Sequence, residues 1–289
     1  MTTAFRRFTL AAVAAALGAV ALPAVSHAAY PGKNGKLAIE GDTRPGIWTV
    51  KPNGDGLTRI TGKKGLPFNP SWSPNGHWIA FTRGGDLWKM RSNGRHKSRL
   101  VQGVPSDIYT NISWSPNSRR LVFDKNDDLW LARANGTNQK QLTTTTNIEM
   151  SPSWSPHGGR IAFGFADSTT GDVELRLIKP DGSGETSIPN TDNGFEPDWS
   201  PNAKRLVYQS AGSGIFLIRP DGSGKGMFAN NGKYFVADPA WSPDGRQIAY
   251  AHNRGTDNTQ IVRKAVTGGK EHVIIARHHW FSPSWRPLP

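Results

Sequence analysis

The sequence Trp241-Ser242-Pro243-Asp244-Gly245 recurs, with small changes, at five other places in the chain. Four clear copies begin at Trp72, Trp114, Trp154 and Trp199, and a degenerate copy begins at Trp285. Successive tryptophans are 42, 40, 45, 42 and 44 residues apart. A period of about 43 residues indicates a repeat architecture, in which each repeat is one supersecondary unit that packs on its neighbours.

Each repeat contains four segments that are typical of strands. The first ends at the Trp and leads into the Ser-Pro-Asp/Asn-Gly turn, whose proline and glycine suit a type I turn. The second is apolar on both faces, as in residues 248–250, which is expected of a strand buried between neighbouring sheets. The third, such as residues 215–218, runs into an Asp-Gly or Asn-Gly hairpin turn. A shorter, more polar fourth strand follows, for example residues 57–61 and 140–143.

The two ends of the chain complete one another. The repeats begin with a second strand at Lys36, and the missing first strand is present at the other end, in residues 282–285. Closing a ring of sheets in this way removes exposed strand edges. The sequence therefore predicts an all-β fold: a six-bladed β-propeller, closed by the C-terminal strand joining the first blade.

The N-terminus has the pattern of an export signal. Arg6 and Arg7 precede an apolar, alanine-rich stretch over residues 8–25, and residues 26–28 suit cleavage after Ala28. We therefore expect a cleaved signal peptide at residues 1–28, a propeller at residues 29–289, and a periplasmic or extracellular location. The alternative is an uncleaved membrane anchor. The chain has no cysteine, which excludes a disulfide framework and a thiol nucleophile.

The charge of the chain favours anionic partners. The formal net charge is +13, and removing residues 1–28 takes away two arginines. For an exported protein this favours an anionic cell-surface polymer or lipid headgroups over nucleic acid. General solubility is the alternative explanation. We expect a monomer without a membrane span once the signal peptide is removed.

The motifs resemble a known family. A Trp-Ser-Pro-Asp-Gly turn, an Ile-Ala-Phe/Tyr strand, an Asp-Leu-Trp strand and a Pro-Asp-Gly-Ser turn recur in phase over residues 30–289. This pattern is similar to the WD40-like (PD40) repeat of TolB-type propellers. The resemblance implies a propeller that binds proteins at the cell envelope. TolB itself carries an α/β domain ahead of its propeller, whereas we expect only a signal peptide ahead of these repeats.

The irregular loops are predicted to share one face, opposite the regular turns, and loops on a rigid scaffold often bind ligands. The position three residues before each Trp is expected near the central channel and is polar in every repeat. It holds Asn69, Asn111, Ser151, Glu196, Asp238 and Ser282. Glu196 and Asp238 are candidate ligands for a hard cation such as Ca²⁺. The alternative is a solvated polar lining of a water-filled channel.

Larger side chains flank these positions and are predicted to floor a pocket for a sugar or a peptide end. They are Phe68, Tyr109, Phe195, Phe235, Trp280 and Phe281, with Arg277, His278 and His279 nearby. The alternative is packing of the loop ends. The predicted ligand-binding set is Phe68, Asn69, Tyr109, Asn111, Phe195, Glu196, Asp238, Arg277, His279 and Trp280.

Five repeats place a cation at the end of the third strand, on the face of the regular turns. These cations are Lys51, Arg91, Arg133, Lys179 and Arg219. In register they would attract an anionic polymer with salt-dependent affinity. The alternative is that their aliphatic stems cover apolar surface and their charges stay in water.

The sequence contains no G-x-S-x-G, H-E-x-x-H or phosphate-loop motif. We therefore expect an exported, non-catalytic protein- or glycan-binding scaffold at the cell envelope. The alternative is a metal-assisted carbohydrate-active enzyme, lyase or hydrolase, with its site at the channel mouth. Its candidate residues are Glu196, Asp238, His252 and His279.

Overall fold

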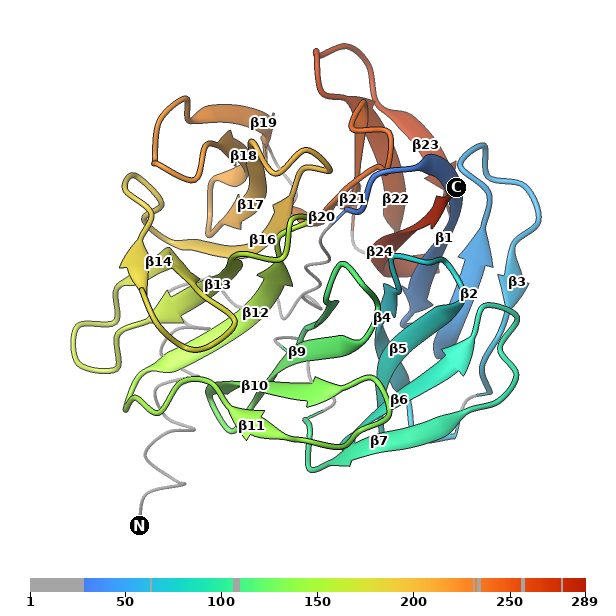
Figure 1. Ribbon diagram of the computed structural model, residues 1–289. Coiled ribbons are helices and arrows are strands. Elements are labelled where there is room, and N and C mark those ends of the chain that lie inside the picture. The colour runs from blue at the N-terminus through green and yellow to red at the C-terminus, as the bar shows by residue number, and fades with distance from the viewer. Residues whose placement is uncertain are drawn as a thin grey trace.

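The structure is a computed structural model that describes residues 29–62, 64–105, 110–230, 232, 235–255, 258–276 and 278–289. The expected signal peptide, residues 1–28, lies outside them. The described residues form 24 β-strands arranged as a propeller (Figure 1). In this part of the chain no helix has the length and hydropathy needed to span a bilayer.

Four sheets have four strands each, paired in chain order. One contains β4 (Pro67–Trp72), β5 (Trp78–Arg83), β6 (Asp86–Arg91) and β7 (Ser98–Gln102). The next contains β8 (Ile112–Trp114), β9 (Arg120–Lys125), β10 (Asp128–Arg133) and β11 (Lys140–Gln141). A third contains β12 (Ile148–Trp154), β13 (Ile161–Ala166), β14 (Val173–Ile178) and β15 (Thr186–Ser187). The fourth contains β16 (Gly194–Trp199), β17 (Leu206–Ser210), β18 (Gly214–Ile218) and β19 (Gly226–Asn230).

A fifth, eight-stranded sheet contains both ends of the described chain (Figure 1). From the C-terminal part come β20 (Val236–Trp241), β21 (Gln247–Asn253), β22 (Asn258–Ala265), β23 (His272–Ile275) and β24 (His278–Leu288). From the N-terminal part come β1 (Lys33–Gly41), β2 (Gly46–Val50) and β3 (Thr58–Arg59). β24 is antiparallel to β1, with Trp285 opposite Leu37 and Ser284 opposite Ala38. The pairing expected from residues 282–285 is therefore present.

The predicted strands agree with the observed ones except at the fourth strand, which is shorter. Residues 57–61 were expected to form this strand, which spans only Thr58–Arg59; in place of 140–143, it spans only Lys140–Gln141. The next N–H groups, of Ile60 and Leu142, still donate to the Ile47 and Leu129 carbonyls. The reason is a threonine after each strand. The Thr61 Oγ1 accepts the Ile47 N–H at 2.8 Å, and the Thr143 Oγ1 accepts the Leu129 N–H at 2.9 Å. A side-chain acceptor thus replaces the next ladder hydrogen bond.

Three of the repeat tryptophans join the inner strands of neighbouring repeats through their indole N–H groups. Trp114 donates its indole Nε1–H to the Ser71 carbonyl at 3.1 Å, and Trp199 does the same to Ser153 at 3.1 Å. Trp285 donates to the Ala240 carbonyl at 3.2 Å. The second strands lie behind them and are fully buried, as in Leu121 and Val122. The repeated tract therefore holds the sheets at close packing distance around the centre.

In five repeats the turn after the third strand contacts the end of the fourth strand of the preceding repeat. Five turn glycines with positive φ make this approach, and a Cβ on them would meet a main-chain carbonyl of that neighbour. They are Gly54, Gly94, Gly136, Gly182 and Gly222. Glycine is required here for its φ and for the close approach.

Replacing Gly136 by alanine is expected to destabilise the protein by about 2 kcal/mol or more. Its φ is +86°, and the new Cβ would overlap the Leu100 carbonyl. Gly212→Ala is the matched control, because Gly212 has a φ of +71° and nothing within 4 Å of its Cβ position. The free energies of unfolding of both variants, measured by urea denaturation, separate the cost of backbone strain from the cost of the overlap with the Leu100 carbonyl. Equal losses for the two variants would contradict the contact.

Candidate functional site

The residues three positions before the tryptophans form β-bulges on the inner strands. Pairing of β4, β12, β16 and β20 with the next strand shifts register at this position. The backbone there is left-handed, with φ of 54–56° at Asn69, Ser151, Glu196, Asp238 and Ser282. Such φ values are uncommon for residues other than glycine. Because this conformation recurs at the same position of the repeats, it is a regular feature of the fold. It changes the direction in which these side chains and N–H groups point.

The bulge residues are linked from one sheet to the next by carboxylates. Glu196 accepts the N–H of Asp238. The Asp238 Oδ2 accepts the N–H of Ser282 at 2.9 Å. Glu40, at the end of the buried run of β1, accepts the Asn69 N–H at 3.0 Å and the Ser282 hydroxyl at 3.1 Å on its Oε2. We call Glu40, Asn69, Glu196, Asp238 and Ser282 the acidic mouth.

The carboxyl groups of the acidic mouth are buried and electrostatically unfavourable. Glu40 is 2% exposed and Asp238 0% exposed. Burial raises the pKa of Glu40 to about 7. Burial and the neighbouring Asp238 raise the pKa of Glu196 well above its usual value. Two adjacent buried carboxyl groups resist carrying two negative charges, and a nearby cation would relieve this.

Of the two other predicted bulge positions, Asn111 has a local partner, whereas the Ser151 hydroxyl has none among the described residues. The Asn111 N–H donates to the Asp124 Oδ1 at 2.7 Å. The Asn69 Nδ2 donates to the Thr110 carbonyl at 2.5 Å, which links β4 to the segment before β8. Ser151 is fully buried on β12. All of these side chains are oriented by the fold, since none has more than 2% of its surface exposed.

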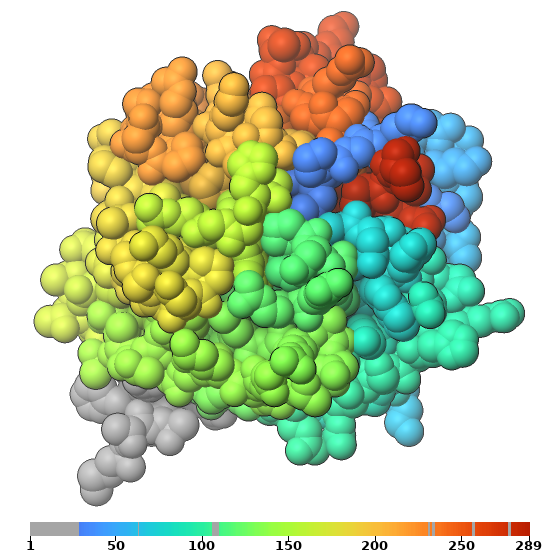
Figure 2. All heavy atoms as spheres, viewed as in Figure 1, coloured from blue at the N-terminus to red at the C-terminus, as the bar shows by residue number. Residues whose placement is uncertain are grey.

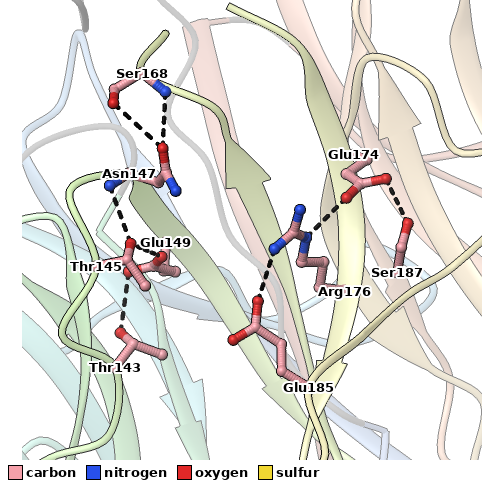
Figure 3. A network of polar contacts seen from close by, with 9 residues as sticks. All are labelled: Thr143, Thr145, Asn147, Glu149, Ser168, Glu174, Arg176, Glu185 and Ser187. Carbon is pink, nitrogen blue, oxygen red and sulfur yellow. Dashed lines mark hydrogen bonds and ion pairs between the residues drawn. The ribbon is translucent and has the colours of Figure 1, made fainter. Parts of the chain in front are cut away.

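Glu149 organises the loop between β11 and β12 (Figure 3). Its Oε2 accepts the Thr143 hydroxyl at 3.0 Å, and its Oε1 accepts the Thr145 hydroxyl at 2.5 Å. The Thr145 Oγ1 in turn accepts the Asn147 N–H, and Asn147 accepts from Ser168. Burial raises the pKa of Glu149 to about 7, although the threonine hydrogen bonds lower it. Glu149 therefore fixes an irregular loop beside the mouth.

A separate ion-pair group covers the outer part of the same sheet (Figure 3). Arg176 contacts Glu174 at 2.7 Å and Glu185 at 2.9 Å, and Glu174 also accepts from Ser187. These side chains are partly exposed and join β14 to β15. Such surface pairs contribute little to stability. We interpret this group as a structural connection between the two outer strands of the sheet.

The large side chains expected to floor a pocket are mostly packed in the interior. Trp280 is 0% exposed and meets Trp48 edge-on, with ring centroids 5.6 Å apart. Phe195 and Phe281 are 6% and 5% exposed, and Phe68 is half-buried. Tyr109 and Arg277 lie outside the described residues. Trp280, Phe195 and Phe281 are therefore part of the core and do not form an exposed pocket floor.

The two histidines considered for catalysis contact Glu271 and Thr259. The His252 Nδ1 contacts the Glu271 Oε2 at 2.9 Å, and Glu271 also accepts from Tyr250 and Arg254. The hydrogen bond from His252 is the largest cause that lowers the pKa of Glu271 to about 2. The His279 Nδ1 lies 3.3 Å from the Thr259 Oγ1. Neither arrangement forms a nucleophile–base pair with the acidic mouth.

The five cations at the ends of the third strands, on the opposite face, are all exposed: Lys51, Arg91, Arg133, Lys179 and Arg219. The Arg91 guanidinium lies 4.0 Å from the Trp78 ring centroid, so part of its side chain covers an aromatic surface. Among the described residues, no group of three or more His, Cys, Asp or Glu side chains is placed to hold a metal ion.

Sequence reasoning missed Glu40 and Asp198. Asp198 precedes Trp199 and is 0% exposed; its Oδ2 accepts the Trp241 N–H at 2.6 Å. At the same position in other repeats, the Ser113 and Ser284 hydroxyls accept the N–H of Trp154 and Trp72. Asp198 could have been noticed in the sequence, because most repeats carry serine at this position. Glu40 gave none, because the position after the second-strand core varies between repeats.

Radially packed four-stranded sheets and recurring inner-strand bulges define a β-propeller. The family model PD40, TolB beta propeller domain, matches residues 9–203, so the chain belongs to this family. A protein TolB homolog from Chlorobium luteolum is 28% identical over 116 residues, which are 39% of this chain and 26% of that protein. The alignment thus spans about a quarter of the relative's length.

Solved structures share the fold. TolB from Acinetobacter baumannii superposes with a TM-score of 0.74 at 14% identity, covering 88% of this chain and 67% of that one. A putative TolB from Agrobacterium tumefaciens gives a TM-score of 0.66 at 16% identity, with 89% and 99% covered. An oligogalacturonate lyase in complex with manganese gives 0.54 at 12% identity, with 86% and 74% covered. These identities establish the fold alone.

Proposed function

We propose that this chain is an exported, non-catalytic propeller that binds a protein of the cell envelope through its acidic mouth. The supporting observation is the Glu196–Asp238 pair, in which burial and then the like charge of Asp238 raise the pKa of Glu196. Groups held in an unfavourable electrostatic state are enriched at functional sites. A cationic group of the partner would offset this charge. An anionic polymer is a poorer match for this face than for the opposite one with its exposed cations.

The proposal includes the domain arrangement. Residues 1–28 are a cleaved signal peptide and residues 29–289 form six blades. On this view the eight-stranded sheet contains two blades, β20–β23 and β24 with β1, β2 and β3. Support comes from the pairing: β24 follows β1 from Lys33 to Gly41, but meets β22 at only two residue pairs. The chain acts as a monomer.

Ca²⁺ is the simplest cation with which to test whether the acidic mouth binds a positive charge. Carboxylate, hydroxyl and amide oxygens suit this hard ion, and Glu196, Asp238, Ser282 and Asn69 supply them. In support, hydrogen bonds link Glu196 to Asp238 and Asp238 to Ser282, and Glu40 links Ser282 to Asn69. We propose Glu196 and Asp238 as the charged ligands. The ion would contribute charge neutralisation and would orient the bulge side chains toward a partner.

Addition of millimolar CaCl₂ is expected to raise the melting temperature of the protein by about 3 °C or more. The Glu196→Gln variant should lose this shift, because one of the two charged ligands is gone. Asp172→Asn, on an exposed loop of the irregular face, should keep it. No shift in the wild type, or an equal shift in Glu196→Gln, would contradict the cation site.

The partner itself is tested by capture from an envelope extract with immobilised mature protein. A protein retained by the wild type and released from Asp238→Asn, but not from Asp172→Asn, supports binding at the mouth. Retention that is equal in all three forms would place the interface elsewhere. Turnover of acidic polysaccharide by the wild type would instead favour the enzyme.

A further inference from the structure

The residues that precede β1 are inserted among the inner strands. The Ala29 N–H donates to the Trp199 carbonyl at 3.2 Å, and the Tyr30 hydroxyl donates to the Trp114 carbonyl of another sheet. The Gly32 N–H donates to the Pro243 carbonyl at 3.2 Å. Ala29 and Tyr30 are 5% and 6% exposed. Figure 2 shows the first described residues, in blue, near the middle of the face and beside the red C-terminal segment.

Packing and hydrogen bonds hold this segment at three different places. Ala29 packs with Val207 and Trp241, whereas Tyr30 packs with Ala162 and Trp199. Burial raises the pKa of the Tyr30 hydroxyl well above its usual value, so it stays a neutral donor. The segment therefore adopts a fixed course across β8, β16 and the turn after β20.

Asp198 is the buried carboxyl nearest to the start of this segment. Its Oδ2 accepts the Trp241 N–H, and the Ala29 and Trp199 N–H groups also lower its pKa. Burial outweighs these hydrogen bonds, so the pKa of Asp198 lies well above its usual value. Among the described residues, its Oδ1 has no hydrogen-bond partner and no Lys, Arg or His forms an ion pair with it. Tyr30 is the titratable group that faces it.

We propose that removal of residues 1–28 makes the α-amino group of Ala29 the ion-pair partner of Asp198. Water hydrolyses the Ala28–Ala29 peptide bond, the carboxylate leaves with residues 1–28, and the new amine takes up a proton. An ordinary α-amino group has a pKa of about 8 and is charged at neutral pH. One N–H of this ammonium keeps the bond to the Trp199 carbonyl, and a second turns to Asp198.

The pairing uses geometry that is already present, because the Ala29 N–H donates to the carbonyl of Trp199, the residue next to Asp198, at 3.2 Å. A secondary amide supplies one donor and no charge, whereas the ammonium supplies three donors and a positive charge. Burial makes an unpaired carboxylate unfavourable, and the ammonium compensates its charge. The mature protein then carries a stabilising contact that its precursor lacks. This inference rests on the cleavage after Ala28 in the proposed function.

The test compares four forms of the protein: the chain starting at Ala29, the same chain with one extra glycine before Ala29, and both carrying Asp198→Asn. At pH 7 the Ala29 form is expected to melt about 5 °C above the extended form. With Asp198→Asn, the two forms should melt within about 1 °C of each other. The ion pair raises the pKa of the amine. The difference is therefore full only where Asp198 is ionised and the pH is below about 8. It is lost as the pH rises through the folded-state pKa of the amine, and again at low pH where Asp198 is protonated.

Two further measurements keep the test decisive. If Asp198→Asn fails to fold, an Nα-acetylated Ala29 chain with Asp198 intact replaces it, and should melt like the glycine-extended form. Equal melting of the Ala29 and extended forms, or a difference that survives Asp198→Asn, would overturn the ion pair. N-terminal sequencing of the exported protein tests the cleavage separately. A start other than Ala29 would refute that part of the proposed function, whatever the melting data show.

Discussion

Replacing Trp114 by alanine is expected to lower the free energy of unfolding by about 3–5 kcal/mol. The side chain is 1% exposed and is among the largest fully buried ones. It packs with Leu121, Phe123 and Ala132, and its Nε1–H donates to the Ser71 carbonyl of the adjacent sheet. Alanine removes the packing and leaves that carbonyl without its donor. Urea denaturation followed by tryptophan fluorescence or circular dichroism measures the loss.

Two other variants divide the effect into its parts. Trp114→Phe keeps most of the packing and removes the hydrogen bond, so we expect a loss of about 1–2 kcal/mol. Trp88→Ala is the matched control on an outer position: Trp88 is half-buried and donates to the Arg83 carbonyl of its own hairpin. A loss for Trp114→Ala no larger than that for Trp88→Ala would contradict the central role of the repeated tryptophan.

The Glu40→Gln variant is expected to be more stable than the wild type at pH 8 by up to roughly 3 kcal/mol. The pKa of Glu40 is raised from 4.5 to about 7 by burial. The folded state therefore holds a proton that the unfolded state releases between about pH 4.5 and 7. Wild-type stability should fall as the pH rises through this window. Glutamine stays neutral and still offers an oxygen to Asn69 and Ser282.

The measurement is the free energy of unfolding at pH 5 and pH 8 for wild type and variant. Glu149 and Glu196, with raised pKa values, add to the wild-type slope in the same direction, so the informative quantity is the difference between the two proteins. Asp172→Asn, at an exposed position, should run parallel to the wild type. If the free energy of unfolding of Glu40→Gln changes with pH as that of the wild type does, Glu40 is ionised in the folded state at pH 5, which contradicts the prediction.

The strand assignments followed from the sequence because the tryptophan tract fixes the register of every repeat. β4 and β20 end at Trp72 and Trp241 as predicted, and β24 pairs with β1. Glu196 and Asp238 occupy the same position of neighbouring repeats, and Glu196 accepts the Asp238 N–H; their role as cation ligands stays a prediction. In a periodic sequence, a structural assignment made for one repeat applies to the equivalent position of the other repeats, wherever the repeats are regular.

The rest depended on contacts between segments that are far apart in sequence. Nothing near Glu40 reveals that it accepts from Asn69 and Ser282, which are 29 and 242 residues away. Trp280 was expected at a pocket floor, yet its ring packs against Trp48. The ligand-binding role of Phe68, Phe195 and His279 stays a prediction. The course of Ala29 and Tyr30 through the inner strands had no sequence signal, because it is set by three separate sheets.

The β1–β24 pairing has a consequence for the order of assembly. One edge of β1 pairs with β2, and its other edge obtains a partner only from β24 (His278–Leu288), close to the C-terminus. A chain emerging from a ribosome or a translocation pore must therefore hold β1 with an open edge until synthesis or transit is complete. Sequence-distant pairing of this kind slows folding and exposes strands to aggregation. C-terminal truncation by a dozen residues should thus abolish folding, whereas a nick in an irregular loop should be tolerated.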